Sequence, residues 1–432
     1  GLLRLQPAKD RQRGLGVRFE IHSAGARAAV VLLCLSVIAP YGWWIERVYR
    51  ASRLADSNRL EDLERAARLV PENAEFPHAA GLQLSESFQS YESAIRYLQT
   101  AATLDPYNAN DWLDLASIDL AAGKLPGQDA ALEQALEAEP GNPDVVAEVA
   151  DYYLAAGEVS RALPLFRRAM VEDPSSAESL LGVSWSATRD AKLMLDQVVP
   201  PNPEIQLEFL RLLTDRGDSA SAHLVWQHLL AGRAIFRPQL SFFYFDYMIR
   251  VHESENFARA CAQLPDDLPS LKNYSPNENL IVNPSFELPL LYGGCDWRYE
   301  RVDHAAAGID DQVAHSGSRS LSATFDGSTV SDLGWKEYVS LQSNKDYEFS
   351  AWIKSEDIVS SSGPRFSIAD AYTGDTILLT DDILDTHSWH EIRGSFRAPE
   401  KTQLATIRII RSPGNTMIRG RVWIDDLRLV PR

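Results

Sequence analysis

A recurring interval of 34 or 35 residues constrains the fold of this chain more than any other feature. Two sets of residues keep it: Ala67, Ala101, Ala135 and Ala169, and Pro71, Pro106, Pro140 and Pro174. Gly123 and Gly157 are also 34 residues apart. A period of this length in several residue types indicates stacked helical hairpins, with glycine in the turn and proline after the second helix. We therefore predict an all-α solenoid over residues 52–271.

Within one repeat, apolar residues recur at steps of three and four, as one face of a helix requires. The unit contains Val146, Val149, Ala150, Tyr153, Gly157, Ala162, Phe166, Ala169 and Pro174. This pattern resembles the tetratricopeptide repeat, whose first helices line a groove that binds proteins. The resemblance implies groove residues Asn110, Asp114, Asp144, Glu148 and Asp151. A merely solvated helix face would carry the same polar residues, so both interpretations stay open.

The repeat register weakens after residue 175, but helical pairs are still predicted at 175–199 and 204–230. Residues 242–247 then predict an aromatic helix, which either covers the last core or exposes a binding patch. The proline-rich segment 264–276 is expected to be a linker or a domain corner. A length of 432 residues is consistent with several domains.

The N-terminal part predicts a membrane anchor. Residues 28–45 are 18 residues without a charged side chain, long enough for a spanning helix. Tyr41, Trp43 and Trp44 lie at its far end, where aromatic rings favour the headgroup layer. A cleaved signal peptide is the alternative, but Pro40 directly after Ala39 would make a poor cleavage site. We favour a permanent anchor.

Charge around this span predicts its orientation. The segment 1–27 carries Arg4, Lys9, Arg11, Arg13, Arg18 and Arg27 against two acidic residues. Basic flanks remain in the cytoplasm, and the three arginines at 47–53 weaken this bias without reversing it. We therefore expect a bacterial inner-membrane protein with a cytoplasmic tail at 1–27 and its bulk in the periplasm. The net charge of −18 argues against nucleic acid as a partner.

After residue 277 the apolar period changes from 3.6 to 2, which predicts a β-sandwich over 277–432. Strands are expected at 347–354, 389–396, 404–410 and 420–429. Four motifs occur in order: NLIVNPSFE at 279–287, HSGSRSL at 315–321, YEFSAWIK at 347–354 and RVWIDDLRL at 421–429. Together they resemble the jelly rolls of carbohydrate-binding module families 4, 9 and 22, in the galactose-binding-like superfamily.

This resemblance implies two kinds of site. Relatives often hold one structural calcium ion, for which Glu287 and one of Asp425 or Asp426 would be the ligands here. Local hydrogen bonds at strand ends are the competing explanation for these acids. Relatives also stack aromatic rings on sugars, which makes candidates of Trp297, Tyr299, Trp335, Tyr338, Trp352 and Tyr372. Trp352 stands out because alternation places it opposite the apolar face of its strand, although packing would explain any one of these rings.

No motif predicts catalysis: the sequence lacks a phosphate-binding loop, a nucleophile elbow and a zinc-type His or Cys cluster. We predict a non-catalytic scaffold whose repeats bind proteins and whose sandwich binds glycan or protein. An accessory role in envelope polysaccharide assembly or export, or in another membrane complex, fits this organisation. The rival hypothesis is a glycan-active enzyme with a binding module. Whether Cys261 pairs with Cys295 remains open, because sequence alone cannot give their separation.

Overall fold

The computed structural model describes residues 24–86, 90–233, 235–274 and 278–432. Its contacts divide the chain into two compact units, with the division between Val149 and Ala150. Most of the predicted cytoplasmic tail at 1–27 lies outside the described residues. Each unit is described separately below.

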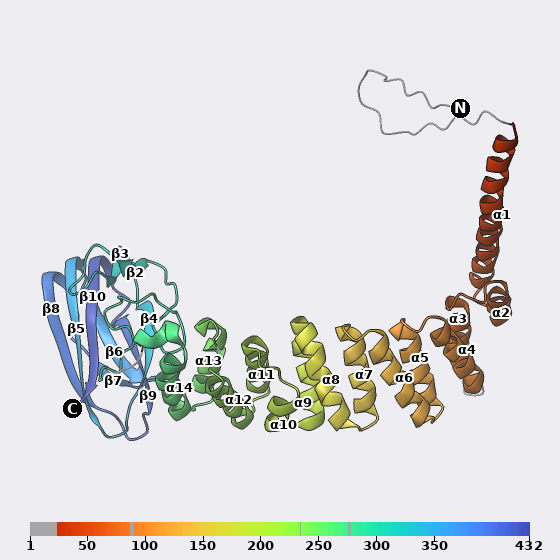
Figure 1. Cartoon of the computed structure of the whole chain (residues 1–432). Helices are drawn as coiled ribbons and strands as arrows, with labels where there is room; N and C mark the ends of the chain where they lie inside the picture. The colour runs from red at the N-terminus through yellow and green to blue at the C-terminus, as the bar shows by residue number, and fades with distance from the viewer. Residues whose placement is uncertain (1–23, 87–89, 234, 275–277) are drawn as a thin grey trace, which may run out of the picture. The chain divides into compact units, whose positions relative to one another are not determined.

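The first unit is helical, as predicted, and it begins with the apolar segment (Figure 1). Its helices are α1 (Ala24–Ala55), α2 (Leu60–Leu69), α3 (Glu75–Ser85), α4 (Tyr91–Leu104), α5 (Ala109–Ala121), α6 (Leu125–Ala138) and α7 (Pro143–Ala155), the last of which crosses the division. Residues 27–55 of α1 are long and apolar enough to cross a membrane. Side chains such as Leu33 and Ile38 are 67% and 63% exposed. The end of α1 packs on α2 and α3 through Ala51, Ala66, Val70 and Phe76.

The repeated residues occupy the positions that the period assigns to them. Ala101 and Ala135 are fully buried between helices, where a larger side chain would push the helices apart. Gly123 adopts a φ of +73° in the turn after α5, a backbone conformation that favours glycine. Pro106 and Pro140 each follow the last residues of a helix, α4 and α6. Alanines between the helices, glycine in the turn and prolines after the helices therefore determine this stack of helical hairpins.

The second unit continues the helical array and then forms the sandwich. Its helices are α8 (Val159–Glu172), α9 (Ala177–Thr188), α10 (Ala191–Gln197), α11 (Pro203–Asp215), α12 (Ser219–Ala231), α13 (Phe242–Arg250) and α14 (Ser254–Asp267), with short 3₁₀ turns η2 (Pro174–Ser176), η3 (Pro238–Ser241) and η4 (Pro269–Tyr274). The predicted helical pairs are confirmed. The segment 264–276 was predicted to be a linker or a domain corner; α14 and η4 occupy most of it, so it is a helical corner and not an extended linker. Buried Leu264, Leu268 and Leu271 hold this segment against the core.

The aromatic helix α13 is mostly packed. Tyr244, Phe245 and Tyr247 are at most 2% exposed. Trp226 of α12 contacts Tyr244 and Phe245, with ring centroids 5.1 and 5.8 Å apart. The aromatic residues therefore close the helical core, as the first of the two interpretations predicted.

The sandwich consists of two antiparallel five-stranded sheets around one apolar core. Its strands are β1 (Arg298–Tyr299), β2 (Ala305–Asp310), β3 (Ser320–Thr329), β4 (Asp332–Ser340), β5 (Asp346–Val359), β6 (Pro364–Asp370), β7 (Thr376–Leu379), β8 (Asp385–Arg397), β9 (Leu404–Arg411) and β10 (Met417–Pro431). We call the sheet β1-β4-β9-β6-β7 the helix-side sheet and the sheet β2-β3-β10-β5-β8 the far sheet. All four predicted strands are confirmed.

Candidate functional site

The outer face of the helix-side sheet is covered by the preceding helices. Helix α14 packs on β4, where the ring of Phe257 meets Tyr338 edge-on at 6.4 Å. His252 stacks on Tyr372 with ring centroids 3.9 Å apart. The Ser254 hydroxyl also donates to the Gln403 side chain at 2.8 Å. Tyr338 and Tyr372 are therefore engaged by packing on this face.

A disulfide bond and a close contact at two glycines also join the preceding helices to the sandwich. We call this region the joint. Cys261 of α14 pairs with Cys295 in the loop before β1, with Cα atoms 5.7 Å apart. The ring of Phe242 lies against Gly293 and Gly294, where an added Cβ would come within 2.7 Å of ring atoms. The question that the sequence left open is thus answered in favour of the bond. The sandwich is fixed to the helices that precede it.

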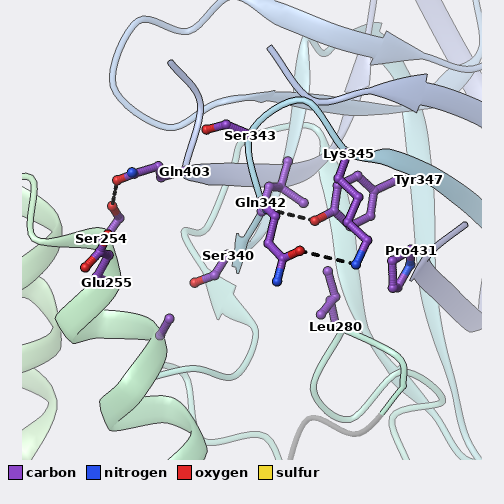
Figure 2. Close-up of a pocket in the computed structure, with 12 residues that line it drawn as sticks. Ser254, Glu255, Leu280, Ser340, Gln342, Ser343, Lys345, Tyr347, Gln403 and Pro431 are labelled. Carbon is purple, nitrogen blue, oxygen red and sulfur yellow. Dashed lines mark hydrogen bonds between the residues drawn. The ribbon is translucent and has the colours of Figure 1, made fainter. Parts of the chain in front are cut away.

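A pocket of about 370 Å³ lies at this joint (Figure 2). Some of its polar groups bond to one another: the backbone N–H of Gln342 donates to the Tyr347 hydroxyl at 2.8 Å. The Lys345 ammonium donates to the Gln342 side chain at 3.2 Å. The lining comes from α14 and from the sandwich, so we assign the pocket to the joint itself.

The far sheet carries a different surface, which we call the tryptophan face: His315, Trp352 and Trp389. The His315 ring stacks on Trp352, with centroids 3.9 Å apart and planes 13° from parallel. It also meets Trp389 at 5.6 Å, nearly edge-on. Trp352 pairs with Glu391 across β5 and β8, which puts Trp352 and Trp389 on the outer side of the sheet. All three side chains are partly exposed.

Two aspartates hold the His315 loop in place. The Asp426 carboxylate lies 2.6 Å from His315 Nδ1 and accepts the hydroxyls of Ser285 and Ser316. Burial alone would raise the pKa of Asp426, but these hydrogen bonds together lower it. Buried Asp425 accepts the backbone N–H groups of His315 and Ser316 at 2.8 and 3.1 Å. The two aspartates of β10 therefore hold the His315 loop in place.

Charged residues surround the tryptophan face. Arg393 donates twice to Glu391, at 2.9 and 2.6 Å, and this bond lowers the pKa of Glu391. On the neighbouring strand, the Lys354 ammonium lies 4.8 Å from the ring centroid of Trp423, which is 2% exposed. Flat rings beside such groups form the kind of surface on which a sugar ring stacks while its hydroxyls find polar partners.

Of the six aromatic residues predicted to bind glycan, only Trp352 lies on this face. Trp297 and Trp335 are 0% and 1% exposed in the sandwich core, so their prediction as stacking platforms is wrong. Tyr299 stacks on Trp335 at 4.7 Å. Tyr338 and Tyr372 pack against helical residues, as described above. These rings pack in the sandwich core or against the preceding helices. Alternation along a strand reveals neither kind of contact.

Sequence reasoning missed His315 and Trp389 as members of the face. Trp389 had a usable signal, because it opens a predicted strand with Glu391 and Arg393 on the same side. His315 had none, since a loop residue reaches a neighbouring strand only through the fold. The two aspartates that position His315 were predicted, but for a metal.

The three predicted calcium ligands are all hydrogen-bond acceptors in the structure. The Glu287 carboxylate accepts the backbone N–H groups of Ser318 and Arg319, each at 2.8 Å. Asp425 and Asp426 likewise accept N–H and O–H groups. Among the described residues, no group of three or more His, Cys, Asp or Glu could hold a metal ion. Calcium needs six to eight converging oxygens, so this donor set fits a hydrogen-bonded clamp.

The predicted groove residues divide between the two units. Asn110, Asp114, Asp144 and Glu148 belong to the first unit, whereas Asp151 belongs to the second. Asp114 is half-buried and its carboxylate lies 2.7 Å from His78 Nε2, while the other four are exposed. The structure therefore joins Asn110 and Asp114 on α5, and the groove shared by all five stays a prediction.

Comparison with known proteins finds a family match within the sandwich. Residues 278–413 match the family of carbohydrate binding domains that comprises modules 4 and 9. No curated protein matches the chain. Among solved structures, a family 4 module is 13% identical and aligns over 35% of this chain and 99% of its own, with a TM-score of 0.28.

Two further structures are similar over the same part of the chain. The xylohexaose-bound CBM22 and GH10 modules of a Clostridium thermocellum endo-1,4-β-D-xylanase are 17% identical over 36% of this chain and 29% of that one, with a TM-score of 0.26. A family 61 module in complex with β-1,4-galactotriose is 17% identical over 36% of this chain and 100% of that one, with a TM-score of 0.25. The family match assigns a carbohydrate-binding domain of the 4 and 9 type to residues 278–413.

Proposed function

We propose that this protein is a membrane-anchored, non-catalytic scaffold that binds a polysaccharide through the tryptophan face. Helices of tetratricopeptide type bind its protein partners. Such a chain serves as an accessory subunit of an envelope polysaccharide assembly or export system, or of another membrane complex. In this proposal it crosses the bacterial inner membrane once, with its N-terminus in the cytoplasm and its bulk in the periplasm.

The observation that carries the proposal is the contrast between the two outer faces of the sandwich. Helices cover the helix-side sheet, and the aromatic side chains that point outward there are used in packing. On the far sheet, two tryptophans and a histidine lie partly exposed beside charged groups. Carbohydrate-binding surfaces combine flat rings with oriented polar groups in this way.

Two features of the chain support the anchor and its orientation. Helix α1 exposes apolar side chains along its length, which water would disfavour and lipid would accept. The bond between Cys261 and Cys295 fits an oxidising compartment such as the periplasm. Protease added to intact spheroplasts should digest the repeats. Full protection of the chain would contradict this orientation.

Polysaccharide binding is tested by retarded migration of the detergent-solubilised full chain in gels that contain one polysaccharide each. We expect retardation by at least one envelope polysaccharide, with no release of reducing ends from it. Release of reducing ends would favour the rival hypothesis of a glycan-active enzyme. Unchanged migration in every polysaccharide would count against glycan binding.

A further inference from the structure

The first unit contains a pocket of about 650 Å³ at the end of the apolar helix. We call it the juxtamembrane pocket, and it is lined by Trp44, Val48, Val70, Glu72, Asn73, Ala74, Glu75, His78, Leu104, Asp105, Asn108, Asn110 and Asp111. Trp44 and Val48 come from α1, directly at and after the end of the uncharged stretch. Asn110 and Asp111 come from the start of α5. The pocket therefore joins the predicted membrane exit to the first repeats.

Apart from His78, the titratable side chains that line this pocket are acidic. Four lining residues are acidic, namely Glu72, Glu75, Asp105 and Asp111, and no described lining residue is Lys or Arg. Arg47 of α1 pairs with Glu72 and so neutralises one of the four. The remaining acids face a space whose walls include Val48, Val70 and Leu104. An apolar wall with an acidic end suits a side chain that has an apolar stem and a cationic head.

At the acidic end, one carboxylate oxygen of Asp111 lacks a partner. It is 2% exposed, and one carboxylate oxygen accepts the Asn108 side-chain amide at 3.1 Å. That same oxygen lies 3.7 Å from His78 Nε2, which is engaged with Asp114. The second oxygen, Oδ2, is buried without a hydrogen-bond partner. A buried acceptor in this state costs free energy, which a donor entering the pocket would recover.

We propose that the juxtamembrane pocket binds an arginine side chain from an extended segment of a partner protein. Guanidinium is weakly hydrated and presents several donors in a plane, so a small rotation of the Asp111 side chain that opens buried Oδ2 to the pocket lets it bind that oxygen and a rim acid together. Its methylene stem would lie along Val48, Val70 and Leu104. This inference rests on the proposed protein-binding role of the repeats and gives that role a chemistry.

The test compares two blocked tripeptides, acetyl-Leu-Arg-Leu-amide and its citrulline counterpart, on the detergent-solubilised full chain. Citrulline keeps the shape of arginine and removes its charge. We expect calorimetric titration to show the arginine peptide binding at least about tenfold more tightly. Asp111→Asn should abolish this difference, and Glu75→Gln should reduce it. Exposed Glu61 on α2, which is not among the lining residues, supplies the control Glu61→Gln, expected to behave as wild type.

Equal affinity for the two peptides would overturn the proposal, as would unchanged discrimination in Asp111→Asn. Thermal unfolding by circular dichroism confirms that the variants fold, and Glu75→Gln provides a second test if Asp111→Asn does not. Displacement of the arginine peptide by short-chain phosphatidylethanolamine at equal affinity would assign the pocket to a lipid headgroup instead. Partner proteins that still co-purify with a chain unable to discriminate would leave the scaffold role intact and remove only the pocket.

Discussion

At the scale of single residues, two carboxyl groups lie deep inside the second unit. Glu337 is fully buried and accepts the Val282 N–H at 2.7 Å. Asp296 is 1% exposed and accepts the Leu291 N–H at 2.7 Å. Burial raises the pKa of Asp296 to about 6 and that of Glu337 well above its usual range. Protonation of either carboxyl group therefore stabilises the native state relative to the unfolded state.

The pKa of Asp296 leads to a prediction for Asp296→Asn. The stabilising effect of the protonated group is complete below about pH 4, where the unfolded aspartate is also protonated. It is lost as the pH rises to the folded pKa of about 6. Relative to wild type, the variant should gain about 2–2.5 kcal/mol of stability between pH 4 and 7. Urea unfolding followed by tryptophan fluorescence measures this, and a pH-independent difference would contradict it.

The aromatic residues show how far sequence reasoning reaches at this scale. Alternation along β5 correctly placed Trp352 opposite the buried Phe349 and Ile353. Alternation along β4 could not show that the Trp335 side chain points inward and fills the core, rather than lying on a binding surface. Tyr338 does face outward on its strand, but a helix covers it. Exposure depends on neighbours that only the tertiary structure supplies.

At the scale of elements, the loop between β2 and β3 is the part most dependent on its partners. The carboxylates of Asp425, Asp426 and Glu287 accept hydrogen bonds from residues of this loop. These hydrogen bonds, rather than apolar contacts, hold the loop in place. This loop carries His315 onto Trp352. The sequence identified these acids from family motifs, and the structure changes the role we assign to them.

A chelation experiment tests that role. Because N–H and O–H donors already occupy the three carboxylates, we expect a chelator to leave the melting temperature of the chain unchanged. A metal that binds only the native state would instead stabilise it by mass action. A lower melting temperature in chelator, restored by calcium, would establish the calcium site and overturn the hydrogen-bonded clamp.

Helix and strand positions were largely predictable at this scale, because local patterns determine them. Pro106 and Pro140 ended helices, Gly123 made a turn, and period 2 marked β5, β8, β9 and β10. The segment 264–276 was not predictable from its prolines. Pro265 lies within α14, and the buried leucines nearby outweigh the helix-breaking tendency that proline brings.

At the scale of the whole molecule, the helices from α8 onward and the sandwich share one compact unit. Sequence reasoning treated 52–271 and 277–432 as separate domains, because the change of period marks a boundary between structural classes. That change carries no information about contacts across the boundary. The packing of Phe242, Phe257 and His252 on the sandwich depends on surfaces that form only after both parts fold.

The disulfide bond gives a prediction for this joint. Replacing both Cys261 and Cys295 with serine should destabilise the second unit by about 3–4 kcal/mol, the chain-entropy estimate for a loop of this size. Denaturant unfolding measures the loss, and Cys34→Ser, which removes the exposed free thiol of α1, should have no such effect. Intact-mass analysis after alkylation under denaturing, non-reducing conditions checks the bond. Alkylation of both Cys261 and Cys295 would show that it is absent.

The most direct test of the whole account is the affinity of the tryptophan face for polysaccharide. The ligand is the polysaccharide that retards the wild-type chain, and the variant is Trp352→Ala combined with Trp389→Ala. Loss of two stacking rings should weaken binding at least about tenfold. Tyr292→Ala, which removes a 58% exposed ring from a loop of the same domain, should leave affinity unchanged. Wild-type affinity in the folded double variant would contradict the assignment of the tryptophan face.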